Sequence, residues 1–213
     1  MADIFDEVEE DLRRARFEQL WKKYWPAILV VAVIIVAGVG GWRFYEWRRD
    51  QQSAAAGSRF EAALRLAGTN SAEAEAQFAA IAADAPSGYR ILARLRQATE
   101  IGSRDKQAGA KAFDAVAADP AIGSLFQDIA RIRAGYLLVD SAPPADIASR
   151  VEALTGAGLP FRHSARELMA LAAMRAGDKA GADKWVRAIQ ADPETPQGLR
   201  GRAELIATVM AGK

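Results

Sequence analysis

The chain has 213 residues, no cysteine, one histidine and a formal net charge of +1 at pH 7. The lack of cysteine excludes disulfides and thiolate metal sites, and the near-neutral charge argues against a nucleic-acid partner. Alanine is frequent and β-branched residues are scarce outside one short stretch. This composition favours helices, because alanine costs least to place in one.

The first 24 residues have the pattern of an amphipathic helical tail. Apolar residues recur there at helical spacing: Ile4, Val8, Leu12 and Ala15 on one stripe, then Phe17, Leu20, Trp21 and Tyr24. Such periodicity is typical of a helix with an apolar face. Two interpretations stay open: an extension of the following helix that lies near a membrane surface, or a docking helix for a cytosolic partner.

A run of 17 residues without a charge, from Pro26 to Trp42, breaks the alanine-rich pattern. A spanning helix needs about 20 apolar residues and at least about 17. Aromatic residues at both ends extend the run, as expected at membrane interfaces. The tryptophans predicted at the two interfaces are Trp21, Trp25, Trp42 and Trp47. A buried core helix would not carry two aromatic girdles, and a signal peptide would not follow a charged tail. The sequence therefore predicts an uncleaved transmembrane helix over residues 25–45.

Basic residues flank the apolar run on both sides, with a small excess before it. The five before it are Arg13, Arg14, Arg16, Lys22 and Lys23, and the four after it are Arg43, Arg48, Arg49 and Arg59. Cytoplasmic flanks carry more lysine and arginine, so this bias places the N-terminus inside the cell. We expect a cytoplasmic tail over residues 1–24 and a domain outside over residues 46–213.

From residue 54 onward, helical segments alternate with turn signals, and no segment has the pattern of a strand. The phrase "AGAKAF", ending at Phe113, returns as "AGADKW", ending at Trp185, and each is followed by Asp-Pro. Phe78 lies 35 residues before Phe113, which lies 72 residues before Trp185. A helix–turn–helix unit of about 34 residues is the signature of tetratricopeptide repeats. The predicted fold is all-α: the transmembrane helix, then a tetratricopeptide-like solenoid of about four helical hairpins and a C-terminal capping helix.

Several residues have predicted roles in these hairpins. Gly181 and Ala182 should let two helices approach closely, and the repeated aromatic residues should fill the space between units. Asn70, with Glu73 three residues on, should cap a helix. The prolines after the second helices should end them. The third unit, around residues 143–158, lacks the aromatic residue and is the least regular.

No catalytic motif is found in the sequence: there is no Walker loop, G-x-S-x-G, H-E-x-x-H or EF-hand loop. The single histidine, His163, follows a turn near a helix start and is interpreted as a surface or capping residue. We therefore predict no catalytic, cofactor-binding or metal-binding residues, and we do not expect an enzyme.

Arginines recur on the predicted first helices of the units, which line the concave surface of a solenoid. They are Arg90, Arg94, Arg96, Arg131, Arg133, Arg162 and Arg166. A basic groove of this kind could attract acidic or extended segments of a partner. The candidate partner-binding residues are Arg90, Arg94, Arg131 and Arg166. The alternative is a solvated face with local salt bridges.

The opening "MADIFDEVEEDLRR", the span ending "GGWRFYEW" and the stretch "LMALAAMRAGDKAGADKWVRAI" resemble the YfgM-like family of ancillary subunits of the bacterial SecYEG translocon. The resemblance covers the whole chain. It implies a single-pass inner-membrane protein with a cytoplasmic N-terminus and a periplasmic repeat domain. The implied partners are the SecYEG translocon, periplasmic chaperones and unfolded exported proteins, with lipid around the span and no cofactor. The alternative function is a general cell-envelope scaffold in cell division or outer-membrane assembly.

Overall fold

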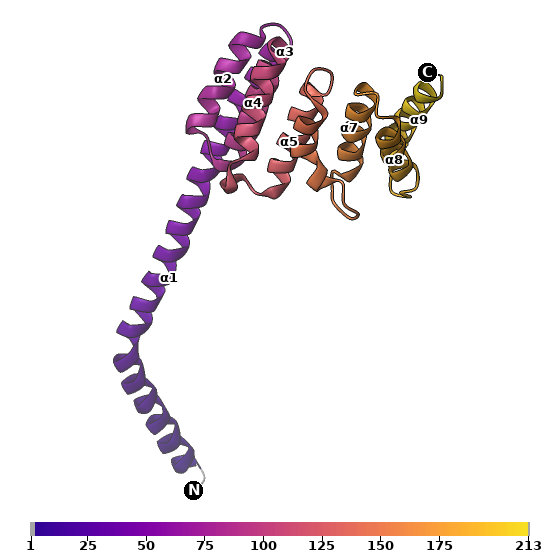
Figure 1. Ribbon diagram of the computed structural model, residues 1–213. Helices are drawn as coiled ribbons and strands as arrows, with labels where there is room; N and C mark the ends of the chain where they lie inside the picture. The colour runs from indigo at the N-terminus through magenta and orange to yellow at the C-terminus, as the bar shows by residue number, and fades with distance from the viewer. Residues whose placement is uncertain (1–2, 213) are drawn as a thin grey trace. The chain divides into compact units, whose positions relative to one another are not determined.

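The computed structural model describes residues 3–212, and the side chains of residues 13, 14 and 16–212. Throughout this part of the chain the only regular structure is helical, and the chain divides into two compact units, Met1–Gln52 and Ser53–Lys213. The α-helices are α1 (Asp3–Ala67), α2 (Ser71–Asp84), α3 (Ser87–Arg104), α4 (Lys106–Ala117), α5 (Ser124–Leu138), α6 (Pro144–Val151), α7 (Arg162–Arg175), α8 (Lys179–Gln190) and α9 (Gln197–Ala211) (Figure 1). Two short 3-10 helices, η1 (Pro120–Ile122) and η2 (Glu152–Leu154), follow α4 and α6. The predicted all-α fold is confirmed.

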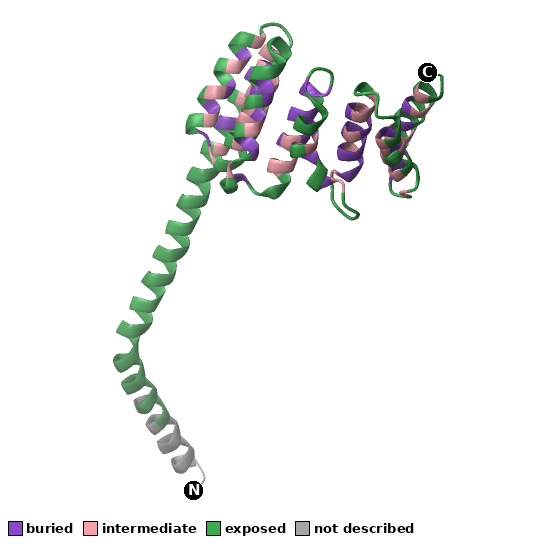
Figure 2. Ribbon diagram, viewed as in Figure 1, coloured by how far each residue is buried: buried purple, intermediate pink, exposed green. Residues whose placement is uncertain are grey.

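The first unit is formed by α1 alone. Between Arg16 and Ala67 this helix contains an 18-residue window with a mean hydropathy of 2.2, none of which is buried. Figure 2 shows α1 exposed along residues 16–52. Among the described residues it is the one helix long and apolar enough to cross a membrane. The first predicted stripe, Ile4, Val8, Leu12 and Ala15, lies outside the described side chains.

The second unit contains four helical hairpins and a final helix. Residues 53–67 of α1 pair with α2, α3 pairs with α4, α5 with α6, and α7 with α8, and α9 covers the end (Figure 1). The first helices also pack on one another, α3 on α5, α5 on α7 and α7 on α9, whereas no comparable packing joins α2, α4, α6 and α8 within the described residues. The first helices therefore form one continuous row, called the inner row below because first helices line the concave surface of such solenoids.

Short polar residues begin the second helix in three of the hairpins. The side chain of Asn70 accepts a hydrogen bond from the backbone N–H of Glu73 at 3.2 Å, which confirms the predicted cap. Asp105 accepts from two backbone N–H groups at the start of α4, and Asp178 accepts from Gly181 N–H at 2.8 Å. Each acceptor satisfies donors that a helix start leaves unpaired. The third hairpin lacks such a cap, since α6 begins after Pro143.

The core consists of three clusters of small and aliphatic side chains, one for each stretch of the stack. Two of the repeated aromatic residues, Phe78 and Phe113, are fully buried in it. The third, Trp185, is only partly buried against the last cluster, and Lys184 Nζ lies 4.6 Å from its ring centroid. In the third hairpin Ile147 and Val151 fill the corresponding space.

Two helices of one hairpin approach closely at Gly102 and Gly109. A Cβ added to Gly109 would overlap the backbone of Gly102, and one added to Gly102 would lie 2.8 Å from Leu137 Cδ1. A Cβ added to Gly181 would instead meet the side chain of its own cap, Asp178. The expected role of Gly181 in closing its hairpin is therefore wrong, although Ala182 is fully buried as expected.

Candidate functional site

An ion pair between the first helix of a unit and the end of its second helix, or the turn just after that helix, recurs along the solenoid. The pairs are Arg59–Asp84 at 3.0 Å, Arg94–Asp119 at 2.5 Å and Arg166–Asp192 at 2.9 Å. Their partners are 25, 25 and 26 residues apart. The guanidinium of Arg94 lowers the pKa of Asp119, as expected for a carboxylate that accepts charged hydrogen bonds. Three of the four units thus have an ion pair that joins the first helix to the end of the second.

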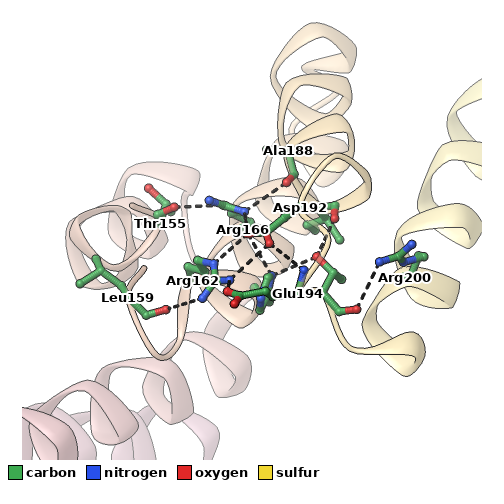
Figure 3. A network of polar contacts seen from close by, with 11 residues as sticks. Thr155, Leu159, Arg162, Arg166, Ala188, Asp192, Glu194 and Arg200 are labelled. Carbon is green, nitrogen blue, oxygen red and sulfur yellow. Dashed lines mark hydrogen bonds and ion pairs between the residues drawn. The ribbon is translucent and has the colours of Figure 1, made fainter. Parts of the chain in front are cut away.

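In the fourth unit the ion pair grows into a buried network, which Figure 3 shows. Arg162 and Arg166, both 8% exposed, converge on Asp192, and Arg162 also bonds to Glu194. Arg166 donates further to the carbonyls of Thr155 and Ala188 at 3.0 and 3.1 Å. Because Arg162 donates to its carboxylate, the pKa of Asp192 lies well below its usual range. The network ties the start of α7 to the segment before this helix and to the turn after α8.

His163 lies inside this network. It is the second residue of α7, only 7% exposed, and its Nδ1 lies 3.1 Å from the hydroxyl of Thr195. That hydroxyl donates to the carbonyl of Ile189 at 2.6 Å, so His163 is neither a surface residue nor a backbone cap. Burial lowers the pKa of His163, and Arg162 lowers it further. The neutral ring is therefore favoured where His163 packs.

A second polar chain crosses the inner row of helices. Tyr136 on α5 donates to Glu167 on α7 at 2.5 Å, and Arg202 on α9 binds the same carboxylate. Glu167 is 3% exposed. Burial and the hydrogen bond to Glu167 raise the pKa of Tyr136 to about 12. This chain fixes the relative positions of three successive first helices.

The structure separates the four candidate arginines into two kinds. Arg94 and Arg166 are engaged in the ion pairs within units. Arg90 is exposed and donates to the carbonyl of Ala85 at 3.1 Å, and Arg131 pairs with Asp128 on its own helix at 3.0 Å. That these four residues contact a partner stays a prediction. Arg94 and Arg166 form salt bridges, as the alternative expected, but Arg166 is buried and does not lie on a solvated face.

Two other arginines on the inner row are exposed: Arg96 on α3 and Arg133 on α5. Neither has an ion pair or hydrogen bond with any described residue, and they occupy the same position of the repeated phrases "ARLR" and "ARIR". In a helix, residues two apart point to different sides, so Arg94 and Arg96 face opposite surroundings. Arg94 lies 25 residues before Asp119, an aspartate followed by a proline. This spacing is the sequence signal that identifies Arg94, and not Arg96, as the residue in the ion pair.

A small pocket lies beside Arg133, between α3, α4 and α5. Its lining combines hydroxyls with apolar side chains: Thr99, Gly102, Ser103, Phe113, Arg133, Tyr136 and Leu137. The hydroxyl of Thr99 donates to the carbonyl of Leu95, so its oxygen is left as an acceptor. The hydroxyl of Ser103 donates to the carbonyl of Glu100 and is also paired with the hydroxyl of Ser71. The guanidinium of Arg133 is the free cationic donor at this pocket. The pocket can therefore accept an apolar side chain of a partner that is flanked either by backbone amides or by an anionic group.

The four tryptophans predicted at membrane interfaces, Trp21, Trp25, Trp42 and Trp47, are all on α1 and about half or more exposed. That they lie at the two interfaces stays a prediction. Among the described residues no group of His, Asp or Glu side chains has the arrangement of a metal site.

Comparison with known proteins finds one family. A model described as a tetratricopeptide repeat-like domain matches residues 18–196. Comparison with curated proteins and with solved structures gave no significant match. The matched range includes the apolar run of α1 as well as the hairpins, and domains of this kind are protein-interaction modules. The chain therefore belongs to the tetratricopeptide repeat-like family.

Proposed function

We propose that the protein is a membrane-anchored, non-enzymatic interaction protein whose repeat domain binds protein partners. The observation that carries this proposal is the joining, within one family match, of a fully exposed apolar helix to a solenoid of hairpins. The proposed division is a tail over residues 1–24, a transmembrane helix over residues 25–45 and a repeat domain over residues 46–213.

The proposed partners follow from the resemblance to the YfgM-like family: the Sec translocon, periplasmic chaperones and emerging exported proteins. This assignment places the protein in the bacterial inner membrane, with its tail in the cytoplasm and its repeat domain in the periplasm. The excess of basic residues before the span supports this orientation. Protease added outside spheroplasts should then digest the chain beyond about residue 50 and spare the tail. Protection of the repeat domain would reverse the orientation.

The proposed binding surface is the inner row of first helices, around Arg96, Arg133 and the pocket beside Tyr136. Support comes from the exposure of both arginines, their freedom from internal ion pairs and the mixed lining of the pocket. Among the four arginines predicted from the sequence, Arg90 and Arg131 lie on the same helices as this surface and are proposed as peripheral contacts. Arg94 and Arg166 are proposed to act indirectly, by keeping the units closed.

Crosslinking of the repeat domain in intact membranes, followed by identification of the adducts, tests the choice of partner. The proposal expects translocon subunits and exported proteins to be enriched. Enrichment of cell-division or outer-membrane assembly proteins instead would favour the general envelope scaffold, which shares every feature described so far.

A further inference from the structure

The segment of α1 just before the apolar run has one uncovered apolar face. Within residues 17–25, apolar or aromatic residues stand at i, i+3, i+4, i+7 and i+8, and the four remaining positions are polar. The apolar set is Phe17, Leu20, Trp21, Tyr24 and Trp25, and the polar set is Glu18, Gln19, Lys22 and Lys23. This is the complete pattern of an amphipathic helix. The rings of Phe17 and Trp21 stack along this apolar face, with their centroids 6.3 Å apart.

The aromatic residues after the apolar run are arranged differently. The ring centroids of Trp42 and Tyr45 lie 6.5 Å apart, and those of Phe44 and Trp47 lie 5.9 Å apart. These two pairs are offset by two residues, so they lie on different sides of the helix. A helix that crosses the headgroup layer meets the same surroundings on every side, which suits such a girdle. A one-sided stripe suits a helix that lies within the plane of the layer.

Pro26 lies inside α1, between the one-sided apolar stripe and the apolar run. It has no N–H to donate to the carbonyl of Lys22, and its ring crowds that carbonyl. Kinks in helices concentrate at such prolines. Beyond it, residues 27–41 contain no polar side chain. A change of direction at Pro26 would therefore sacrifice fewer hydrogen bonds than one at any neighbouring residue.

The charges of the segment match a headgroup layer of negative lipids. Lys22 and Lys23 lie on the polar side, and Lys23 Nζ is 5.6 Å from the ring centroid of Tyr24. Neither lysine forms an ion pair with a described residue. The acidic residues at the start of the tail lie farther from the apolar run, at positions 3–11. Basic residues beside a membrane are attracted by anionic lipid.

We propose that residues 17–25 form an interfacial helix, whose stripe faces the acyl chains and whose lysines contact anionic headgroups, with Pro26 as the bend into the span. This inference rests on the proposed membrane anchor. We assign lipid as the occupant of the apolar face, because the stripe is continuous with the candidate span and is bordered by cations.

The chain has no cysteine, so single cysteines can be introduced one at a time from residue 17 to residue 25 of the full chain. Spin labels on them are measured after reconstitution into vesicles of phosphatidylcholine with phosphatidylglycerol. Lipid exposure should alternate, with labels at the stripe positions immersed and labels at positions 18, 19, 22 and 23 in water. A depth that increases steadily by about 1.5 Å per residue toward Pro26 would show a straight helix and overturn the proposal. Water exposure at every position, as expected for a face reserved for a cytosolic protein, would also overturn it.

Labels at Val31 and Ile35 separate this inference from the anchor itself. If these two labels are immersed in lipid while residues 17–25 form a straight helix or lie in water, the proposal of an interfacial helix is wrong and the membrane anchor stands. If they too are in water, the anchor fails.

The charge of the lysines is tested with Lys22→Glu and Lys23→Glu together, against Lys111→Glu and Lys179→Glu, which change two exposed lysines of the repeat domain. In vesicles containing phosphatidylglycerol, the ratio of immersed to water-exposed label at Leu20 should fall at least roughly fivefold for each lysine replaced in the segment. The control pair should leave it unchanged. An equal ratio in both double variants would overturn the role of anionic lipid.

Discussion

The hairpins α3–α4 and α7–α8 carry the same phrase of small residues and are held together by different means. In α3–α4, Gly102 and Gly109 bring two backbones into contact, and one partly exposed ion pair, Arg94–Asp119, closes the unit. In α7–α8, a buried network around Asp192 does most of the closing. Sequence similarity between repeats thus preserves the positions of the helices without preserving the interactions that fix them.

The largest expected effect comes from breaking the buried network, with the equivalent arginines as internal controls. Arg166→Ala should reduce the free energy of unfolding by about 3 kcal/mol, because it removes a buried partner of Asp192 and leaves two carbonyls without a donor. Arg94→Ala, at a partly exposed pair, should cost about 1 kcal/mol or less. Arg131→Ala, paired only within its helix, should cost about 0.5 kcal/mol or less.

Denaturant unfolding of the three variants in detergent, followed by circular dichroism, measures this order. Equal losses for Arg166→Ala and Arg94→Ala would contradict the difference between the two hairpins.

For glycine substitutions we expect the larger loss of stability in α3–α4 and the smaller one in α7–α8. Gly109→Ala places a methyl group against the backbone of Gly102, so we expect a loss of about 2 to 3 kcal/mol in the free energy of unfolding. Gly181→Ala meets only the movable side chain of Asp178. The better helix propensity of alanine, about 1 kcal/mol, offsets the disturbed cap.

The same unfolding measurement compares the two glycine variants. A Gly181→Ala variant as damaged as Gly109→Ala would support the expectation that Gly181 lets its two helices approach closely.

A smaller effect should appear with pH and only in the fourth unit. The pKa of His163 is lower in the folded protein than in the unfolded chain, so the unfolded chain binds the proton more readily. Its contribution to stability is complete above the unfolded pKa of about 6.5 and is lost as pH falls through the folded pKa. The charged groups around it are Arg162, Arg166, Asp192 and Glu194.

Hydrogen exchange at pH 7.5 and pH 5.5 can follow this loss by region. Amides of α7 and α8 should lose protection at the lower pH, while those of α3 and α4 do not, because the chain has a single histidine. His163→Gln should remove the difference. A loss of protection that survives this substitution would point to another group.

Local signals were sufficient to predict most of the fold. The cap at Asn70 and the prolines after the second helices act within a few residues of their position, so their effect can be read without knowing what packs nearby. The repeated aromatic residues reveal the unit through their regular spacing along the chain. The hairpins and the final helix follow from them.

The candidate site could be predicted only in part, because it depends on which side of a helix meets a neighbour. Arg94 and Arg96 look equivalent in the phrase "ARLR", yet one binds Asp119 and the other is exposed. His163 looked like a surface residue because its buried partners, Thr195 and Asp192, come from a turn about 30 residues further along. Such long-range partners have no local signature.

The central claim is that the inner row of helices is the surface on which a membrane-anchored protein binds its partners. A photo-crosslinking residue at position 96 or 133 tests it most directly in intact membranes, with position 111 on the exposed side of α4 as the matched control. The account predicts protein adducts from positions 96 and 133 that are lost with an Arg→Glu change at the neighbouring site, and none from position 111. Adducts from position 111 without any from positions 96 and 133 would contradict it.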